Sequence, residues 1–141
     1  LGANILRNDL PRYTNGLLKP RKQNDSLATY AVKIEKSHGL IDWSMSAIQI
    51  LRRMRAFEPW PGSYTYLPSK NKRLLKIHSA KIVQGSGSPG QVLGLNSNGV
   101  EVATGTGSLL LEVVQREGGA ILSINDFLNG HCLSKGDFLG L

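Results

Sequence analysis

The sequence is poor in three features that define large classes of proteins. Cys132 is the single cysteine among 141 residues, which excludes an internal disulfide and favours a reducing compartment. No long uncharged apolar run is present, so no membrane-spanning segment is expected. Leu1–Ile5 contains neither an initiator methionine nor the basic-then-apolar pattern of a signal peptide. We interpret this start as a cut within a longer polypeptide.

Residue patterns that perform chemistry are also scarce. His38, His78 and His131 are scattered and have no second ligand at metal-binding spacing. No serine lies in a pattern typical of an activated nucleophile, and Cys132 is interpreted as a half-buried structural residue, with a reactive thiol as the alternative. The glycines of Gly85–Gly90 satisfy a dinucleotide-binding pattern, but a strand-like stretch follows where the pyrophosphate would need a helix N-terminus. We therefore predict no catalytic residue, no metal and no bound cofactor in this chain.

Acidic residues are few, and the resulting positive charge is unevenly distributed. The net charge is +7 at neutral pH. Between Arg52 and Lys81, Glu58 alone opposes eight basic residues, whereas acidic residues outnumber basic ones from Ile82 onward. A concentrated positive field favours a polyanion such as nucleic acid, although solvated lysines and arginines on a surface would give the same pattern.

The first part of the chain predicts a helix and then a linker. Apolar residues recur at helical spacing from Ala3 to Tyr13, Pro11 is expected to kink or break the helix, and Asn15-Gly16 supplies a stop. Because this single apolar stripe has nothing local to pack against, residues 1–18 are expected to belong to a preceding domain. Residues 19–41 read as a linker, with an extended piece at Ala28–Ile34.

Residues 42–141 predict a mainly β domain. A helix capped by Ser44 or Ser46 should run to about Phe57 and end at Pro59–Gly62. Close-spaced strands without intervening helices predict a small antiparallel open barrel of the oligonucleotide-binding kind, with this leading helix and a short helix near the C-terminus. The expected strands are Ser63–Leu67, Leu74–Val83, Gln91–Leu95, Val100–Thr104, Ser108–Gln115 and a closing Gly136–Gly140, and the short helix is Ser123–Leu128.

Four aromatic side chains accompany the basic segment. Aromatic rings beside cations can stack nucleic-acid bases. We nevertheless predict that Trp43 and Trp60 are core residues, because burial is the commoner use of a large ring. Tyr64 and Tyr66 share one strand face, so either both point inward or both are available outside.

Arg55–Thr65, which reads RAFEPWPGSYT, resembles the opening of the C-terminal domain in the methionyl-tRNA formyltransferase family. The similarity covers nearly the whole chain in order, and His78, where many relatives carry tryptophan, is a departure that concerns packing. The further similar segments are Ala28–Ala31, Lys33–Lys36, Ile41–Ser44, Lys76–Ala80, Pro89–Val92, Leu109–Glu117, Phe127–Gly130 and Leu133–Gly140.

The resemblance implies that catalysis and tRNA binding belong to two different domains, which residue spacing alone does not reveal. In this family an N-terminal Rossmann-like domain binds 10-formyltetrahydrofolate and carries the catalytic Asn, His and Asp, none of which falls in this chain. Leu1–Leu18 then corresponds to the last helix of that missing catalytic domain, and the chain alone should be inactive. The barrel would hold initiator methionyl-tRNA during translation initiation, in a bacterial cytoplasm or alternatively an organelle matrix.

Related enzymes with the same two-domain plan formylate a sugar nucleotide or hydrolyse formyltetrahydrofolate, and these remain the alternative. The basic segment favours tRNA, because a sugar nucleotide carries few negative charges. The side chains expected to contact phosphates are Arg52, Arg53, Lys70, Lys72 and Arg73, with Lys33 and Lys36 as secondary contacts.

Overall fold

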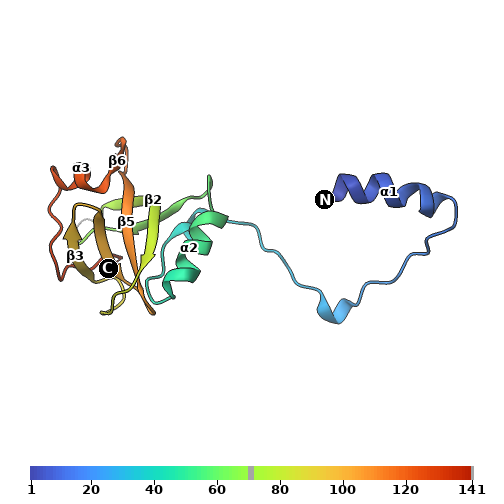
Figure 1. Cartoon of the computed structure of the whole chain (residues 1–141), viewed down its shortest axis with the longest axis horizontal. Helices are drawn as coiled ribbons and strands as arrows, with labels where there is room; N and C mark the ends of the chain where they lie inside the picture. Colours follow the sequence, from blue (N-terminus) through green and yellow to red (C-terminus); the bar gives the residue numbers. More distant parts are fainter. Residues whose placement is uncertain (70–71, 141) are drawn as a thin grey trace. The chain divides into compact units, whose positions relative to one another are not determined.

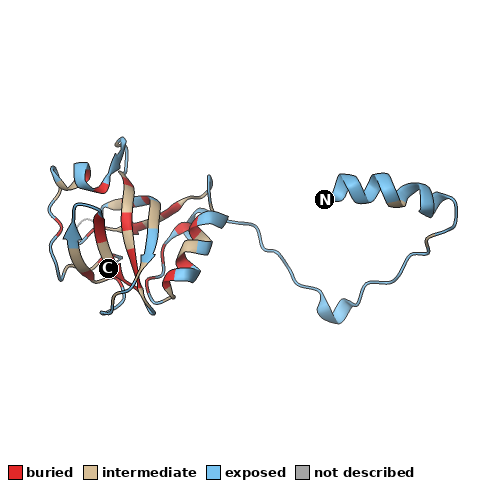
Figure 2. Cartoon of the chain, viewed as in Figure 1, coloured by how far each residue is buried: buried red, intermediate tan, exposed pale blue. Residues whose placement is uncertain are grey.

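The computed structural model describes residues 1–69 and 72–140, and these form two compact units, Leu1–Lys33 and Ile34–Leu141. In the first unit, α1 runs from Gly2 to Thr14 with no buried residue, and a short 3₁₀ helix follows at Asp25–Leu27 (Figures 1 and 2). Ala28–Ile34 forms no strand. No described helix has the length and apolar character needed to cross a membrane.

The sequence predicts that Pro11 kinks or breaks α1, and the helix is not broken there. A proline removes one backbone hydrogen bond, the one that its own N–H would donate. The remaining turn is held by the carbonyl of Pro11, which accepts from the Asn15 N–H at 3.1 Å and from the Thr14 hydroxyl at 3.0 Å. The helix therefore continues for one turn beyond Pro11 and ends at Asn15-Gly16, as the sequence predicts, with Gly16 in the left-handed region.

The second unit is an open antiparallel sheet of six strands in the order β1-β2-β5-β4-β3, with β6 paired to β5 (Figure 1). Five strands lie where the sequence places them, whereas the short β6 was not predicted. The strands are β1 (Ser63–Tyr66), β2 (Leu74–Val83), β3 (Val92–Asn96), β4 (Gly99–Ala103), β5 (Ser108–Arg116) and β6 (Ile121–Ser123).

Two helices cover the core of the sheet. α2 spans Ala47–Ala56, and the Ser46 and Gln49 side chains form a capping box at its start. Its apolar residues recur at helical spacing, and Ile50 and Met54 are buried against the sheet. α3 spans Ile124–Leu128 and buries Phe127. The core is completed by fully buried side chains of the strands, among them Leu75, Val92, Val100, Val102, Leu109, Leu111 and Val114 (Figure 2).

The predicted closing strand Gly136–Gly140 forms only a single bridge, between Gln91 and Phe138. The left-handed backbone of Gly136 and Gly140 interrupts the extended conformation that a regular strand needs. The segment Ser134–Gly140 still contacts both outer strands of the open sheet. Its hydrogen bonds include Val92 N–H to the Asp137 carbonyl at 2.8 Å, on the β3 side, and Gly140 N–H to the Tyr66 carbonyl at 2.8 Å, on the β1 side.

The end of the expected linker packs on β1. A short 3₁₀ helix at Lys36–Gly39 precedes a parallel bridge between Leu40 and Tyr64, and the Ile41 N–H donates to the Tyr64 carbonyl at 2.8 Å. Gly39 is buried so closely that an added Cβ would lie 2.2 Å from the Gly62 carbonyl oxygen. The compact unit that contains the sheet thus begins at Ile34.

Candidate nucleic-acid interface

The outer face of β1, β2 and β5 gathers aromatic and basic side chains. Along β1, Tyr64 and Tyr66 alternate with the buried Ser63 and Thr65, so both tyrosine rings lie on the outer face. Their centroids are 6.0 Å apart in an edge-on arrangement. Burial raises the pKa of the Tyr64 phenol, so this hydroxyl stays protonated at neutral pH. In the sheet register Tyr64 pairs with Lys76, which pairs in turn with Gln115 of β5.

A groove of about 250 Å³ lies on this face. We call it the basic groove and define it by three cationic side chains, Lys36, Lys76 and Arg116, and two aromatic ones, Trp60 and Tyr64. A second hollow of about 370 Å³, lined by Lys72 and Arg73, shares Arg116 with it. Glu117 is the one acidic residue that lines either hollow.

Trp60 is not a core residue, and here the sequence-based prediction is wrong. Its side chain is 57% exposed, whereas Trp43 is 5% exposed and does lie in the core. The Trp43 indole N–H donates to the Thr65 hydroxyl at 3.0 Å. Trp60 instead lies in the turn between α2 and β1, which is closed by a 2.9 Å hydrogen bond from the Gly62 N–H to the Phe57 carbonyl. This turn holds the indole at the surface.

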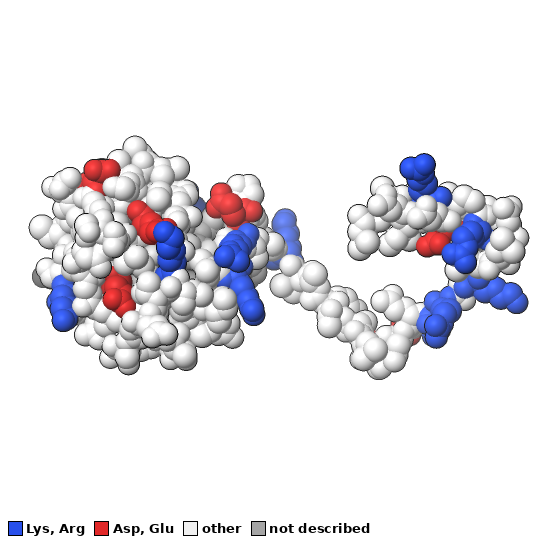
Figure 3. Space-filling model, viewed as in Figure 1, with Lys and Arg blue, Asp and Glu red and all other residues white. Residues whose placement is uncertain are grey.

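The structure brings only part of the predicted phosphate-contacting set to this face. Lys36 lines the basic groove, and Lys72 and Arg73 line the neighbouring hollow. Arg52 is exposed on α2, over which Lys and Arg atoms gather in Figure 3. Lys33 is exposed in the other unit, and Lys70 lies outside the described residues.

Sequence reasoning missed Lys76 and Arg116 as members of the site. Lys76 could have been predicted from the alternation along its strand. It lies between Leu75 and Ile77, which are buried, and must therefore face outward. Arg116 stands in the acidic half of the sequence and reaches the groove only through the pairing of β5 with β2. No local pattern marks it.

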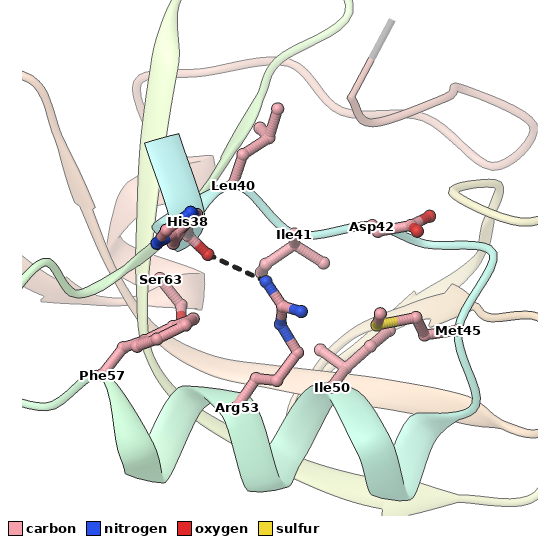
Figure 4. Close-up of a pocket in the computed structure, with 10 residues that line it drawn as sticks. His38, Leu40, Ile41, Asp42, Met45, Ile50, Arg53, Phe57 and Ser63 are labelled. Atoms are coloured by element: carbon pink, nitrogen blue, oxygen red, sulfur yellow. Dashed lines mark hydrogen bonds between the residues drawn. The ribbon is translucent and has the colours of Figure 1, made fainter. Parts of the chain in front are cut away.

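Arg53 has structural partners on two sides, whereas Lys72, another of the predicted cations, lies over the Tyr66 ring, 6.0 Å from its centroid. Its guanidinium donates to the His38 carbonyl at 3.1 Å and lies 5.3 Å from the centroid of the Phe57 ring (Figure 4). The three residues line a small cavity of about 10 Å³ between α2 and the segment before Ile41. Arg53 therefore fixes this segment to α2.

Replacing Arg53 with glutamine is expected to lower the free energy of unfolding by about 1–2 kcal/mol, because a charge-assisted hydrogen bond and a ring contact are lost together. Arg52→Gln on the same helix is the control and should change it by less than about 0.5 kcal/mol, because that side chain is exposed. Urea unfolding followed by circular dichroism measures both variants. Equal effects would show that the contact to His38 adds no stability.

Lys81 is also paired, with Glu112 on the neighbouring strand. Hydrogen bonds from Lys81 and then from the Ser79 hydroxyl, the latter at 2.9 Å, lower the pKa of the Glu112 carboxyl. Because this pKa is lower in the folded state, the pair contributes stability above the ordinary pKa of glutamate and loses it as pH falls through the lowered value.

The stability difference between the wild-type chain and Glu112→Gln should therefore be present near neutral pH and vanish in acid. We expect less than about 1 kcal/mol, because the Lys81 side chain is 70% exposed. Urea unfolding of both proteins between about pH 7 and about pH 3 measures the difference. A difference that stays constant over this range would exclude the ion pair as its cause.

No group of three or more His, Cys, Asp or Glu side chains in the described part of the chain is arranged to hold a metal ion. Gly85–Gly90 leads into β3 and is an inter-strand loop. The side chains that characterise this face are thus cationic and aromatic. Such a surface can bind a polyanion through phosphate contacts and offer rings to stack against.

Comparison with known proteins agrees with this architecture. The family described as formyl transferase, C-terminal domain, matches residues 33–132. A methionyl-tRNA formyltransferase of Citrifermentans bemidjiense is 44% identical over 140 residues, which is 99% of this chain and 43% of that relative. One of Myxococcus xanthus is 46% identical over 136 residues, 96% of this chain and 43% of that relative. The chain therefore spans less than half the length of these curated relatives.

A solved structure supports the fold. The crystal structure of HypX from Aquifex aeolicus in complex with tetrahydrofolic acid has a TM-score of 0.56 at 21% identity, covering 99% of this chain and 28% of that one. At this identity the likeness concerns the fold alone. The family match over most of the sequence confirms the resemblance first seen at Arg55–Thr65, and the chain belongs to the family of formyl transferase C-terminal domains.

Proposed function

We propose that this chain is the C-terminal, tRNA-positioning part of a methionyl-tRNA formyltransferase. The observation that carries the proposal is that relatives bearing this name match 96–99% of the chain at 44–46% identity. The whole enzyme would transfer a formyl group from 10-formyltetrahydrofolate to initiator methionyl-tRNA. In this proposal the protein would act in translation initiation, in the cytoplasm of a bacterium.

In this proposal, catalysis belongs to a separate N-terminal domain. α1 would be the last helix of that domain, and residues 19–33 the connection to the barrel. The exposed apolar side chains of α1, among them Leu6, Leu10 and Tyr13, support this, because no core within their own unit covers them. Neither the folate nor the formyl group needs to contact the barrel.

The barrel would hold tRNA through its phosphates. Lys72, Arg73, Lys76 and Arg116 lie along one face, and Lys36 is at its border. Among the described residues, these five form no ion pair with an acidic side chain. Two of them have other neighbours, since Arg116 lies 3.3 Å from His131 Nε2 and Lys72 lies over the Tyr66 ring. Arg52, Lys33 and Lys70 are proposed as further contacts. Contacts of this kind fix the orientation of a nucleic acid without reading its sequence.

Titration of the 141-residue chain with initiator tRNA at several salt concentrations tests the proposal. With three to five phosphate contacts, the slope of log affinity against log salt should be about −2 to −4.5. A nucleoside diphosphate sugar is the control ligand and should not bind measurably. Binding of the sugar nucleotide without binding of tRNA would contradict the proposal and favour the sugar-nucleotide branch of the family.

A further inference from the structure

Trp60 does not pack in the core, so core packing does not explain why a tryptophan stands at this position. The core position is taken by Trp43, which is buried and hydrogen-bonded to Thr65. The Trp60 indole is instead 57% exposed and lines the basic groove beside three cationic side chains. Phosphate binding needs those cations but no indole. An exposed tryptophan among cations indicates a ligand that combines negative charge with a flat ring.

The indole is presented on an ordered turn. The rings of Pro59 and Pro61 fix the φ angles on both sides of Trp60. The hydrogen bond from the Gly62 N–H to the Phe57 carbonyl closes the turn, and Tyr64 follows directly on β1. A ligand that stacks on Trp60 therefore orders little additional chain, and less conformational entropy is lost on binding.

The groove also fits such a ligand in size and charge. Its volume of about 250 Å³ offers room for a single base. Lys36, Lys76 and Arg116 line the same groove as the indole, so a phosphate next to the stacked base would meet a cation. Glu117 lies beside Arg116 and is the acidic member of the lining.

We propose that the basic groove is a subsite for an unpaired nucleotide of the bound RNA, in which Trp60 stacks on the base while Lys36, Lys76 and Arg116 contact the adjacent phosphates. The inference rests on the proposed function, because RNA supplies both a base that can stack on the indole and phosphates that can meet the cations. Bases inside a duplex hide their faces in the helical stack, so Trp60 selects a nucleotide outside paired regions.

The first experiment measures the affinity of the full chain for initiator tRNA. Trp60→Ala should weaken binding by about 10-fold, a typical loss for one stacked base, and leave the salt slope unchanged because no phosphate contact is removed. Trp60→Phe should retain most of the affinity, since an aromatic face remains. Ile82→Ala, which removes another exposed apolar side chain, at 45% exposure, is the matched control and should have no effect. Wild-type affinity in Trp60→Ala would overturn the subsite.

The second experiment follows tryptophan fluorescence while single-stranded RNA or a blunt duplex with equal phosphate number is added. Stacking should quench the wild-type emission with single-stranded RNA, and quenching should disappear in Trp60→Phe, whose remaining indole is the buried Trp43. Equal quenching by the duplex, or by polyglutamate as an acidic peptide, would overturn the base-stacking assignment.

The two experiments separate this inference from the proposed function. If tRNA binding depends on the cationic side chains but not on Trp60, the tRNA-binding function stands and the subsite fails. If initiator tRNA does not bind while single-stranded RNA still quenches Trp60, the subsite stands and the assignment to tRNA fails. If neither RNA binds, both proposals fail.

Discussion

Simultaneous replacement of Lys72, Arg73 and Lys76 by glutamine is expected to weaken binding of initiator tRNA by about 100- to 1000-fold at about 0.1 M salt. These three cations line the two hollows on the outer face of β1, β2 and β5. Each phosphate contact releases condensed counterions, which contributes about tenfold to affinity at this salt concentration. For the same reason, the slope of log affinity against log salt should become less negative by about 2–3. Filter binding or fluorescence anisotropy over a salt series measures both quantities.

The control removes the same charge elsewhere. Arg12 is paired with Asp9, Lys81 is paired with Glu112, and Lys135 lies in the closing segment. Their joint replacement by glutamine should weaken tRNA binding by less than about threefold, through the change in net charge alone. If both triple variants lose affinity equally, tRNA responds to the total charge of the chain and not to this face.

Replacement of Trp43 by alanine is expected to lower the free energy of unfolding by about 3–5 kcal/mol. The indole is buried between elements far apart in sequence, because it bonds to Thr65 on β1 and packs beside Gly90 and Gly140. Its loss creates a cavity and leaves the buried Thr65 hydroxyl without its partner. Urea unfolding followed by far-ultraviolet circular dichroism measures the change.

Trp60→Ala is the matched control, since it deletes the same side chain at an exposed position. It should change the free energy of unfolding by about 0.5 kcal/mol or less. Thr65→Val in combination with Trp43→Phe isolates the hydrogen bond, because the double variant should be less destabilised than the sum of the two single ones. Equal destabilisation by Trp43→Ala and Trp60→Ala would contradict the assignment of Trp43 to the core.

Most of the fold could be predicted because its determinants are local. β2 has its predicted bounds, Leu74–Val83, and α2 begins after its capping residue Ser46. The errors arise where tertiary contacts decide whether a segment forms a regular strand. β6 is three residues long and forms only because β5 offers it a partner at Val113–Gln115. The predicted strand Gly136–Gly140 contains the apolar pair Phe138-Leu139, yet the left-handed backbone of Gly136 and Gly140 keeps it out of a regular ladder.

The site was harder to predict than the fold. Lys72 and Arg73 were predicted because they belong to a basic run, but a run of charge does not say which of its members share a surface. Arg53 looked equivalent to Arg52 in sequence, although one is bonded to the His38 carbonyl and the other is exposed. Which of two tryptophans fills the core depends on the space left by Gly90 and Gly140, and that space exists only in the folded chain.

The position of Ser134–Gly140 between the two outer strands has a consequence for biosynthesis. Until these residues leave the ribosome, the Tyr66 carbonyl on β1 and the backbone of Val92 on β3 lack their partners, while all six strands have already been made. Unpaired outer strands invite pairing with other chains. Nascent copies on one messenger are therefore most prone to mutual aggregation in this interval, before Ser134–Gly140 has been made.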